Sequence, residues 1–95
     1  MDKVTEILHS RGKEYGDRFI NIECIAELKA VWHKHRRQSI PRREAEFNHC
    51  MEMALVKIAR ICTGVFKDDN FNDAAGYLEL ARCMAKGETD VNPTR

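Results

Sequence analysis

Proline, glycine and aromatic residues are scarce in this sequence. Its 95 residues include 2 prolines and 5 glycines, and 7% of them are aromatic. This composition excludes a collagen-like or low-complexity chain. The formal net charge is only +1, so no overall field indicates a specific nucleic-acid partner. Apolar runs fall well short of the length that spans a bilayer. We therefore expect neither a membrane partner nor a specific nucleic-acid partner.

Paired cysteines are also absent. Structural zinc sites usually show close ligand pairs, and a disulfide framework belongs to secreted domains. No signal peptide is expected, because only Val4, Ile7 and Leu8 follow the N-terminal Met-Asp-Lys as large apolar residues. We therefore predict a cytoplasmic protein whose cysteines are reduced and packed in the core. There are four of them, and no two form a CxxC pair: Cys24, Cys50, Cys62 and Cys83.

The apolar content suffices for one small domain. Hydrophobic residues make up 43% of the chain and charged residues 33%, a balance typical of short amphipathic helices with solvated outer faces. We predict a single helical domain over residues 1–87, with residues 88–95 as a flexible tail. Because a chain of this length buries only a modest fraction of its surface, we also expect a homo-oligomer, either a dimer or a tetramer.

Apolar residues recur at helical spacing in four segments, which predict four helices. The expected fold class is all-α, a four-helix array. The alternative is an open helical pair that completes its core only as a dimer. The predicted helices cover residues 2–11, 18–37 and 43–62, and a fourth runs from Phe71 to just before Gly87.

Residues at the helix ends support these limits. Gly64 is expected to end the third helix and Gly87 the fourth. Asn70 is predicted as the N-cap of the fourth helix, with Asp73 as the acidic member of a capping box. The residues predicted to face the core are Phe19, Ile22, Ile25, Ala26, Leu28 and Trp32 in the second helix, Phe47, Cys50, Met51, Ala54, Ile58 and Ile61 in the third, and Phe71, Ala74, Ala75, Leu78, Ala81 and Ala85 in the fourth.

A polar stripe lies beside the apolar stripe of the third predicted helix. At 100° per residue, its members fall within about one quarter of the circumference. Two of them, Lys57 and Arg60, are one turn apart and repel each other unless an acid or an anion lies close. The fourth helix supplies Asp73 and Tyr77, and Asp69 precedes them. The stripe consists of Glu46, His49, Met53, Lys57 and Arg60.

Two interpretations of this cluster stay open. In the first, ion pairs of Arg60 with Asp73 and of Lys57 with Asp69 close a helical hairpin, and Tyr77 packs its ring between the helices. In the second, the acids hold a divalent ion and the cations bind phosphate. Mg²⁺ sites for phosphate chemistry use one or two carboxylates plus substrate oxygens, and Lys and Arg neutralise developing charge.

Three further features each allow two interpretations. Residues 33–37 read HKHRR, which either complements a helix dipole or forms an anion-binding patch. His49 and Glu52 have the spacing of a helical metal motif but no second ligand pair, so a boundary histidine is expected. Tyr15 stands in a Tyr-Gly-Asp turn, where it either helps to cap the next helix or stacks on a base.

Four segments together resemble a family of small phage and prophage proteins. They are RGKEYGD at 11–17, Trp32, ALVKIARI at 54–61 and DNFNDAAGYLEL at 69–80. That family is similar in pattern to the all-α nucleoside triphosphate pyrophosphohydrolases of the MazG-like type. The resemblance implies an oligomeric helical protein that cleaves nucleoside triphosphates with Mg²⁺, in the host cytoplasm if a phage encodes it.

The resemblance also implies roles for individual residues. Glu46, Asp69 and Asp73 correspond to metal ligands, and Asp73 and Glu52 to catalytic residues. Lys57, Arg60, Tyr15 and Tyr77 correspond to nucleotide- or phosphate-binding residues. The ExxE pair of MazG-like enzymes is absent, and Asn70 stands where their second motif has glutamate. We therefore carry three hypotheses: a pyrophosphohydrolase, a non-catalytic binder of a nucleotide or signal, and a phage interaction module that inhibits a host protein through residues 33–37.

Overall fold

The computed structural model describes residues 3–4, 18–37, 40 and 42–87. These residues contain no strand, which confirms the all-helical class. The first predicted helix lies almost entirely outside the described residues, and so does the predicted tail, so the four-helix array stays a prediction. Three long helices are present: α2 (Arg18–His35), α3 (Glu44–Thr63) and α4 (Asp68–Ala85).

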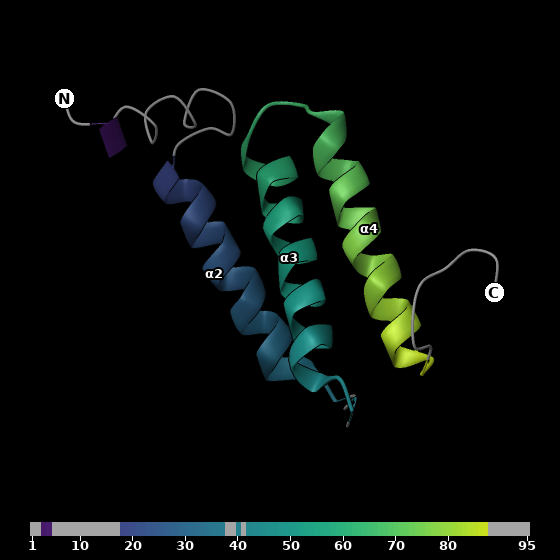
Figure 1. The fold of residues 1–95 in the computed structure, drawn as a ribbon. Helices are drawn as coiled ribbons and strands as arrows, with labels where there is room; N and C mark the ends of the chain where they lie inside the picture. Colours follow the sequence, from purple (N-terminus) through teal and green to yellow (C-terminus); the bar gives the residue numbers. More distant parts are fainter. Residues whose placement is uncertain (1–2, 5–17, 38–39, 41, 88–95) are drawn as a thin grey trace.

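The three helices lie side by side in one layer, with α3 in the middle and neighbours antiparallel (Figure 1). Helix α3 packs against both neighbours, whereas the backbones of α2 and α4 do not approach each other. The layer therefore has two open faces. We call the face that carries His49 and Asp73 the front face, which is turned towards the viewer in the figures. The face that carries Ile58 and Phe71 is the back face.

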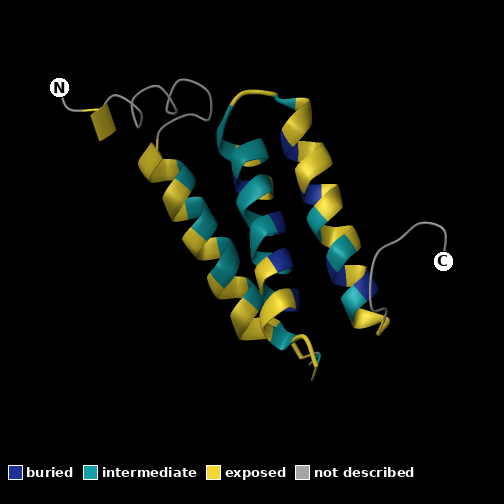
Figure 2. Ribbon diagram, viewed as in Figure 1, coloured by how far each residue is buried: buried dark blue, intermediate teal, exposed yellow. Residues whose placement is uncertain are grey.

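The core lies between α3 and α4, at the end of the layer where α3 begins. Figure 2 shows buried residues on the facing sides of α3 and α4 and none on α2. Phe47, Cys50 and Ala81 form the buried cluster. Partly buried side chains complete it: Trp32, Ile40, Met51, Tyr77, Leu80 and Met84.

Alanines bring the helices close together along the rest of the layer. Ala54 and Ala74 are buried on α3 and α4, and Ala59 has no exposed surface at all. A methyl side chain lets two helix backbones approach closely, but it contributes little apolar area. Helix packing therefore depends heavily on the Phe47 cluster at one end.

Glycines end α3 and α4 as predicted, by different means. Gly64 caps α3 in an extended conformation (φ −116°), and its N–H donates to the carbonyl of Arg60 at 3.1 Å. Gly87 follows α4 with φ +81°, and its N–H donates to the carbonyl of Met84 at 3.0 Å. The left-handed conformation requires glycine only at Gly87.

The predicted start of the fourth helix is wrong. Helix α4 begins at Asp68, its N-cap is Lys67, and no side chain caps it. Asn70 lies within the first turn and is buried, so it does not form the predicted capping box with Asp73. Asp68 and Asp69 instead complement the positive end of the helix dipole, which lets a polar segment form the first turn.

Several predicted core residues are exposed. They include Phe19 and Ile22 on α2, and no residue of α2 is fully buried. Ile58 on α3 and Phe71 and Leu78 on α4 are also exposed, because all three lie on the back face, which nothing in the described chain covers. The prediction is confirmed for the buried residues Phe47, Cys50, Ala54, Ala74 and Ala81.

All four cysteines are free thiols. Cys50 and Cys83 are buried, as predicted, while Cys24 is half-buried and Cys62 is exposed. Burial raises the pKa of the Cys50 thiol, which keeps it protonated. In the described part of the chain, no helix combines the length and apolarity needed to cross a membrane.

Candidate functional site

An ion pair joins α3 to α4 on the front face. Lys57 Nζ lies 3.0 Å from Asp73 Oδ2. The Lys57 side chain is only 13% exposed, whereas that of Asp73 is 48% exposed. The antiparallel course of the two helices brings these residues opposite each other, so Asp73 pairs with Lys57, whereas Arg60 was its predicted partner. The largely buried ammonium of Lys57 therefore contacts a carboxylate that is itself exposed to water.

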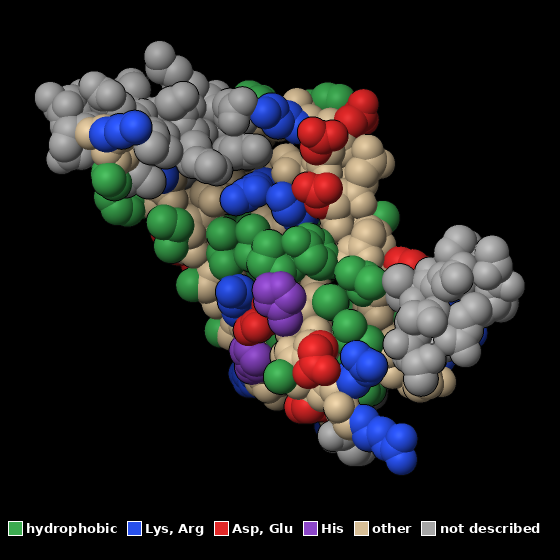
Figure 3. Space-filling view, viewed as in Figure 1, with side chains coloured by type: hydrophobic (Ala, Val, Ile, Leu, Met, Phe, Trp, Pro, Cys, Tyr) green, Lys and Arg blue, Asp and Glu red, His purple; other side chains and the backbone are tan. Residues whose placement is uncertain are grey.

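Arg60 and Asp69 extend this pair towards the end of the layer. Arg60 lies one turn beyond Lys57 on α3 and is half-buried, and Asp69 lies one turn before Asp73 on α4 and is exposed. Figure 3 shows Lys and Arg side chains beside Asp and Glu side chains on this part of the front face, next to an apolar band. Four charges of both signs therefore gather at the α3–α4 seam.

Tyr77 borders the pair on its other side. Its ring makes an edge contact with the ring of His49, with centroids 6.5 Å apart and planes at 89°. Tyr77 is half-buried and packs against the core cluster, while His49 is exposed. The core therefore fixes the orientation of the tyrosine ring beside Asp73.

An open groove of about 540 Å³ runs along α4 next to Tyr77. Gly76 lies in its lining, where a Cβ atom would meet no heavy atom of the chain within 4 Å. Glycine in a helix interior costs about 1 kcal/mol relative to alanine, and no neighbouring atom requires it here. The lining also includes Asn72, Asp73, Tyr77, Glu79 and Leu80.

The acids of the predicted metal site do not gather around one point. Among the described residues, no three His, Cys, Asp or Glu side chains are grouped so as to hold a metal ion. Glu46 lies about 16 Å along α3 from Lys57, the partner of Asp73. Glu46 is instead 3.8 Å from Arg43, and Glu52 binds His33 at 2.9 Å. These donors do not fit the predicted Mg²⁺ site.

The contact of Glu52 with His33 also bears on whether His49 and Glu52, which have the spacing of a helical metal motif, act together. Glu52 points across to α2, whereas His49 contacts Tyr77 on α4. The two side chains therefore serve different helix contacts. Tyr15, the remaining predicted binding residue, lies outside the described residues.

The basic segment 33–37 contributes one residue to the interior. The Arg36 side chain is 10% exposed, lies 3.0 Å from Glu44 and also bonds Asn48. Its guanidinium lies 5.3 Å from the ring centroids of both Trp32 and Phe47. Arg36 therefore ties the end of α2 to the start of α3, a role that its place in a run of basic residues concealed.

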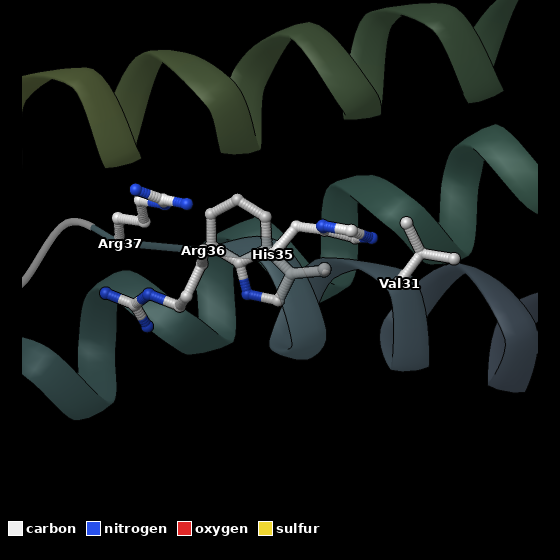
Figure 4. Close-up of a pocket in the computed structure, with 5 residues that line it drawn as sticks. Val31, His35, Arg36 and Arg37 are labelled. Carbon is white, nitrogen blue, oxygen red and sulfur yellow. The ribbon is translucent and has the colours of Figure 1, made fainter.

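Beside Arg36 is a second hollow, of about 450 Å³ (Figure 4). Val31, Trp32, His35 and Arg37 line it together with Arg36. Trp32 Nε1 is buried and has no hydrogen-bond partner within the described chain. Because Arg36 is bound to Glu44, the exposed cation at this hollow is Arg37.

In the described part of the chain, the site thus lies on a layer of three helices, at a charged seam between α3 and α4. The chain is a member of the family described as a domain of unknown function (DUF6378), whose model matches residues 1–85. No curated protein and no solved structure matches the sequence.

Proposed function

We propose that this protein binds a nucleotide, or a similar phosphorylated ligand, at the α3–α4 seam without cleaving it. Gly76 is the observation that carries the proposal. Within the described chain, no atom packs against the open side of this helical glycine, so the space above it is available to a ligand. The groove shares Asp73 with the Lys57 ion pair.

The neighbouring side chains supply complementary chemistry. The edge of the groove presents the Tyr77 ring, which can contact a base, together with Asn72 and Asp73. The Asn72 amide can donate or accept hydrogen bonds with a base or ribose, and the Asp73 carboxylate can accept them. Lys57 and Arg60 lie on the adjoining turns of α3 and are the cations that a phosphate would meet. This order of groups fits a ligand with an aromatic ring at one end and an anion at the other.

The placement of the acids favours binding over hydrolysis. A MazG-like phage enzyme would need carboxylates around Mg²⁺, whereas Glu46, Glu52 and Asp73 each contact a different side chain of the described chain. If bound, Mg²⁺ would neutralise phosphate charge, but the donors described above do not fit it. Pyrophosphate release from nucleoside triphosphates in the presence of Mg²⁺ tests the enzyme hypothesis directly, and turnover would favour it over the binder.

Support for an interaction module through residues 33–37 is weaker. Arg36 is committed to Glu44, Asn48 and two rings. Lys34, His35 and Arg37 remain exposed and could contact an acidic partner. A pull-down with an Arg37→Glu variant beside the wild type would test this second candidate.

The binding proposal is tested by calorimetric titration with nucleoside mono- and triphosphates. Arg60→Gln should weaken binding of the preferred nucleotide at least about tenfold, which is about 1.4 kcal/mol. Arg42→Gln is the matched control, because Arg42 is an exposed arginine before the start of α3. Absence of binding by the wild type, or equal affinity of the Arg60 and Arg42 variants, would overturn the proposal.

A further inference from the structure

The back face of the layer is apolar and open. Six large apolar residues of α2, α3, α4 and the α3–α4 loop are exposed on it. At its centre, Ile58 is 40% exposed even though α3 has a helix on either side. The six are Ile20, Val31, Ile58, Phe66, Phe71 and Leu78.

These residues form one continuous surface. The rings of Phe66 and Phe71 touch, with centroids 5.9 Å apart. Phe71 and Leu78 are seven residues apart on α4 and so share one side of the helix. On the α2 side, the Cys24 and Cys62 thiols lie close enough to hydrogen bond, which joins α2 to α3 across the same face.

Few charged side chains of α3 and α4 lie on this face, whereas on α2 Glu27 lies close to Cys24, between Ile20 and Val31. Between residues 51 and 62, the charged side chains are Glu52, Lys57 and Arg60. Glu52 binds His33, Lys57 binds Asp73, and Arg60 lies one turn from Lys57. Between residues 70 and 81 they are Asp73 and Glu79, which line the groove on the other side of α4. These charged side chains therefore leave the back face of the α3–α4 hairpin apolar.

We propose that two copies of this chain associate back to back, each covering the other's apolar face. Helical domains are built from at least two packed layers, and the described helices supply one. A two-fold contact requires a surface complementary to itself, and the apolar back face of α3 and α4, centred on Ile58, meets that condition without charge repulsion. This interface lies opposite the α3–α4 seam and is independent of the proposed nucleotide site.

The exposed area matches what such an interface needs. A large apolar side chain that is about half exposed presents roughly 100 Å², so the six residues present roughly 600 Å² per chain. That is at the upper limit for the largest patch of a typical monomer. With the half-buried side chains around them, it approaches the 800 Å² or so that each partner buries in a standard interface.

The test is the mass of the full chain in solution, measured by size-exclusion chromatography with light scattering. The wild type should be a dimer at about 100 µM and dissociate on dilution. Ile58→Glu should be monomeric with an unchanged helical circular dichroism spectrum. Ile22→Glu is the matched control, because Ile22 is an exposed isoleucine of α2 that the back face does not include, and this variant should stay dimeric.

A second measurement needs no variant. Cys62 is exposed in the single chain and would be covered in the dimer, so its alkylation should slow severalfold as the wild-type concentration rises. A wild type that is monomeric at about 100 µM, as when residues 1–17 of the same chain cover the back face, would overturn the proposal. So would an Ile58→Glu variant that remains dimeric, or a Cys62 alkylation rate that does not depend on concentration.

Discussion

Lys57 and Asp73 differ sharply in their exposure although they are bound to each other at 3.0 Å. The lysine depends on the aspartate for its counter-charge, because the ammonium group is largely removed from water. The aspartate depends much less on the lysine, because about half of its surface is hydrated. The two residues should therefore respond differently to substitution.

Asp73→Asn should lower the free energy of unfolding by about 1–3 kcal/mol, because it leaves a largely buried cation without its counter-charge. Lys57→Met should cost at most about 1 kcal/mol, since methionine retains the apolar stem and Asp73 stays hydrated. Urea unfolding of both variants measures the difference. Equal losses would contradict this view of the pair.

Gly76→Ala should raise stability by about 0.5–1 kcal/mol, because alanine favours the helix and the added methyl group meets no atom of the chain. The same methyl group should weaken nucleotide binding by filling the groove. Thermal unfolding and calorimetric titration of one variant thus report opposite effects. If stability rises while affinity is unchanged, the ligand does not lie over Gly76.

Arg36→Lys should destabilise the fold by about 1–2 kcal/mol, because lysine cannot reproduce the planar contacts with two rings and the bonds to Glu44 and Asn48. The neighbouring Arg37→Lys should change stability by less than about 0.5 kcal/mol, since Arg37 is exposed. Urea unfolding of the two variants side by side is the measurement. A similar loss in both would show that Arg36 acts only as a surface charge.

Much of the fold was predictable because apolar spacing and glycines define α2, α3 and the end of α4. The start of α4 was not predictable in this way. Its acidic first turn resembles a loop in the sequence unless the favourable interaction of acids with the helix dipole is considered. Periodicity also misplaced the packed side of α4. Phe71 and Leu78 form one apolar stripe and Ala74 and Ala81 another, and spacing alone does not say which stripe packs within the chain.

The candidate site was predictable in part for a related reason. Antiparallel helices joined by a short loop must bring Asp73 near Lys57 or Arg60, so the ion pair follows from topology. The metal site did not follow, because Glu46 shares a helix face with Lys57 but lies several turns away. The role of Arg36 depends on the Trp32 and Phe47 rings, which only the packing of α2 on α3 brings together.

Alkaline pH should destabilise the protein through Cys50. Burial raises the pKa of this thiol above its ordinary 9.0, so the unfolded chain loses the proton before the folded chain does. Stability is therefore retained below pH 9.0 and falls as the pH rises above it. Urea unfolding between about pH 8 and pH 10 should show a smaller loss for Cys50→Ala than for the wild type; identical slopes would exclude this contribution.

The backbones of α2 and α4 do not approach each other, which limits how motion can spread through the described layer. Helix α2 buries no residue fully, so it can swing away from α3 while the α3–α4 hairpin stays intact. Amide hydrogens of α2 should then exchange with solvent through this local opening, and those of α3 only through global unfolding. A signal from the Lys57–Asp73 pair to α2 should therefore pass through α3 or through the Phe47 cluster, against which Trp32 packs.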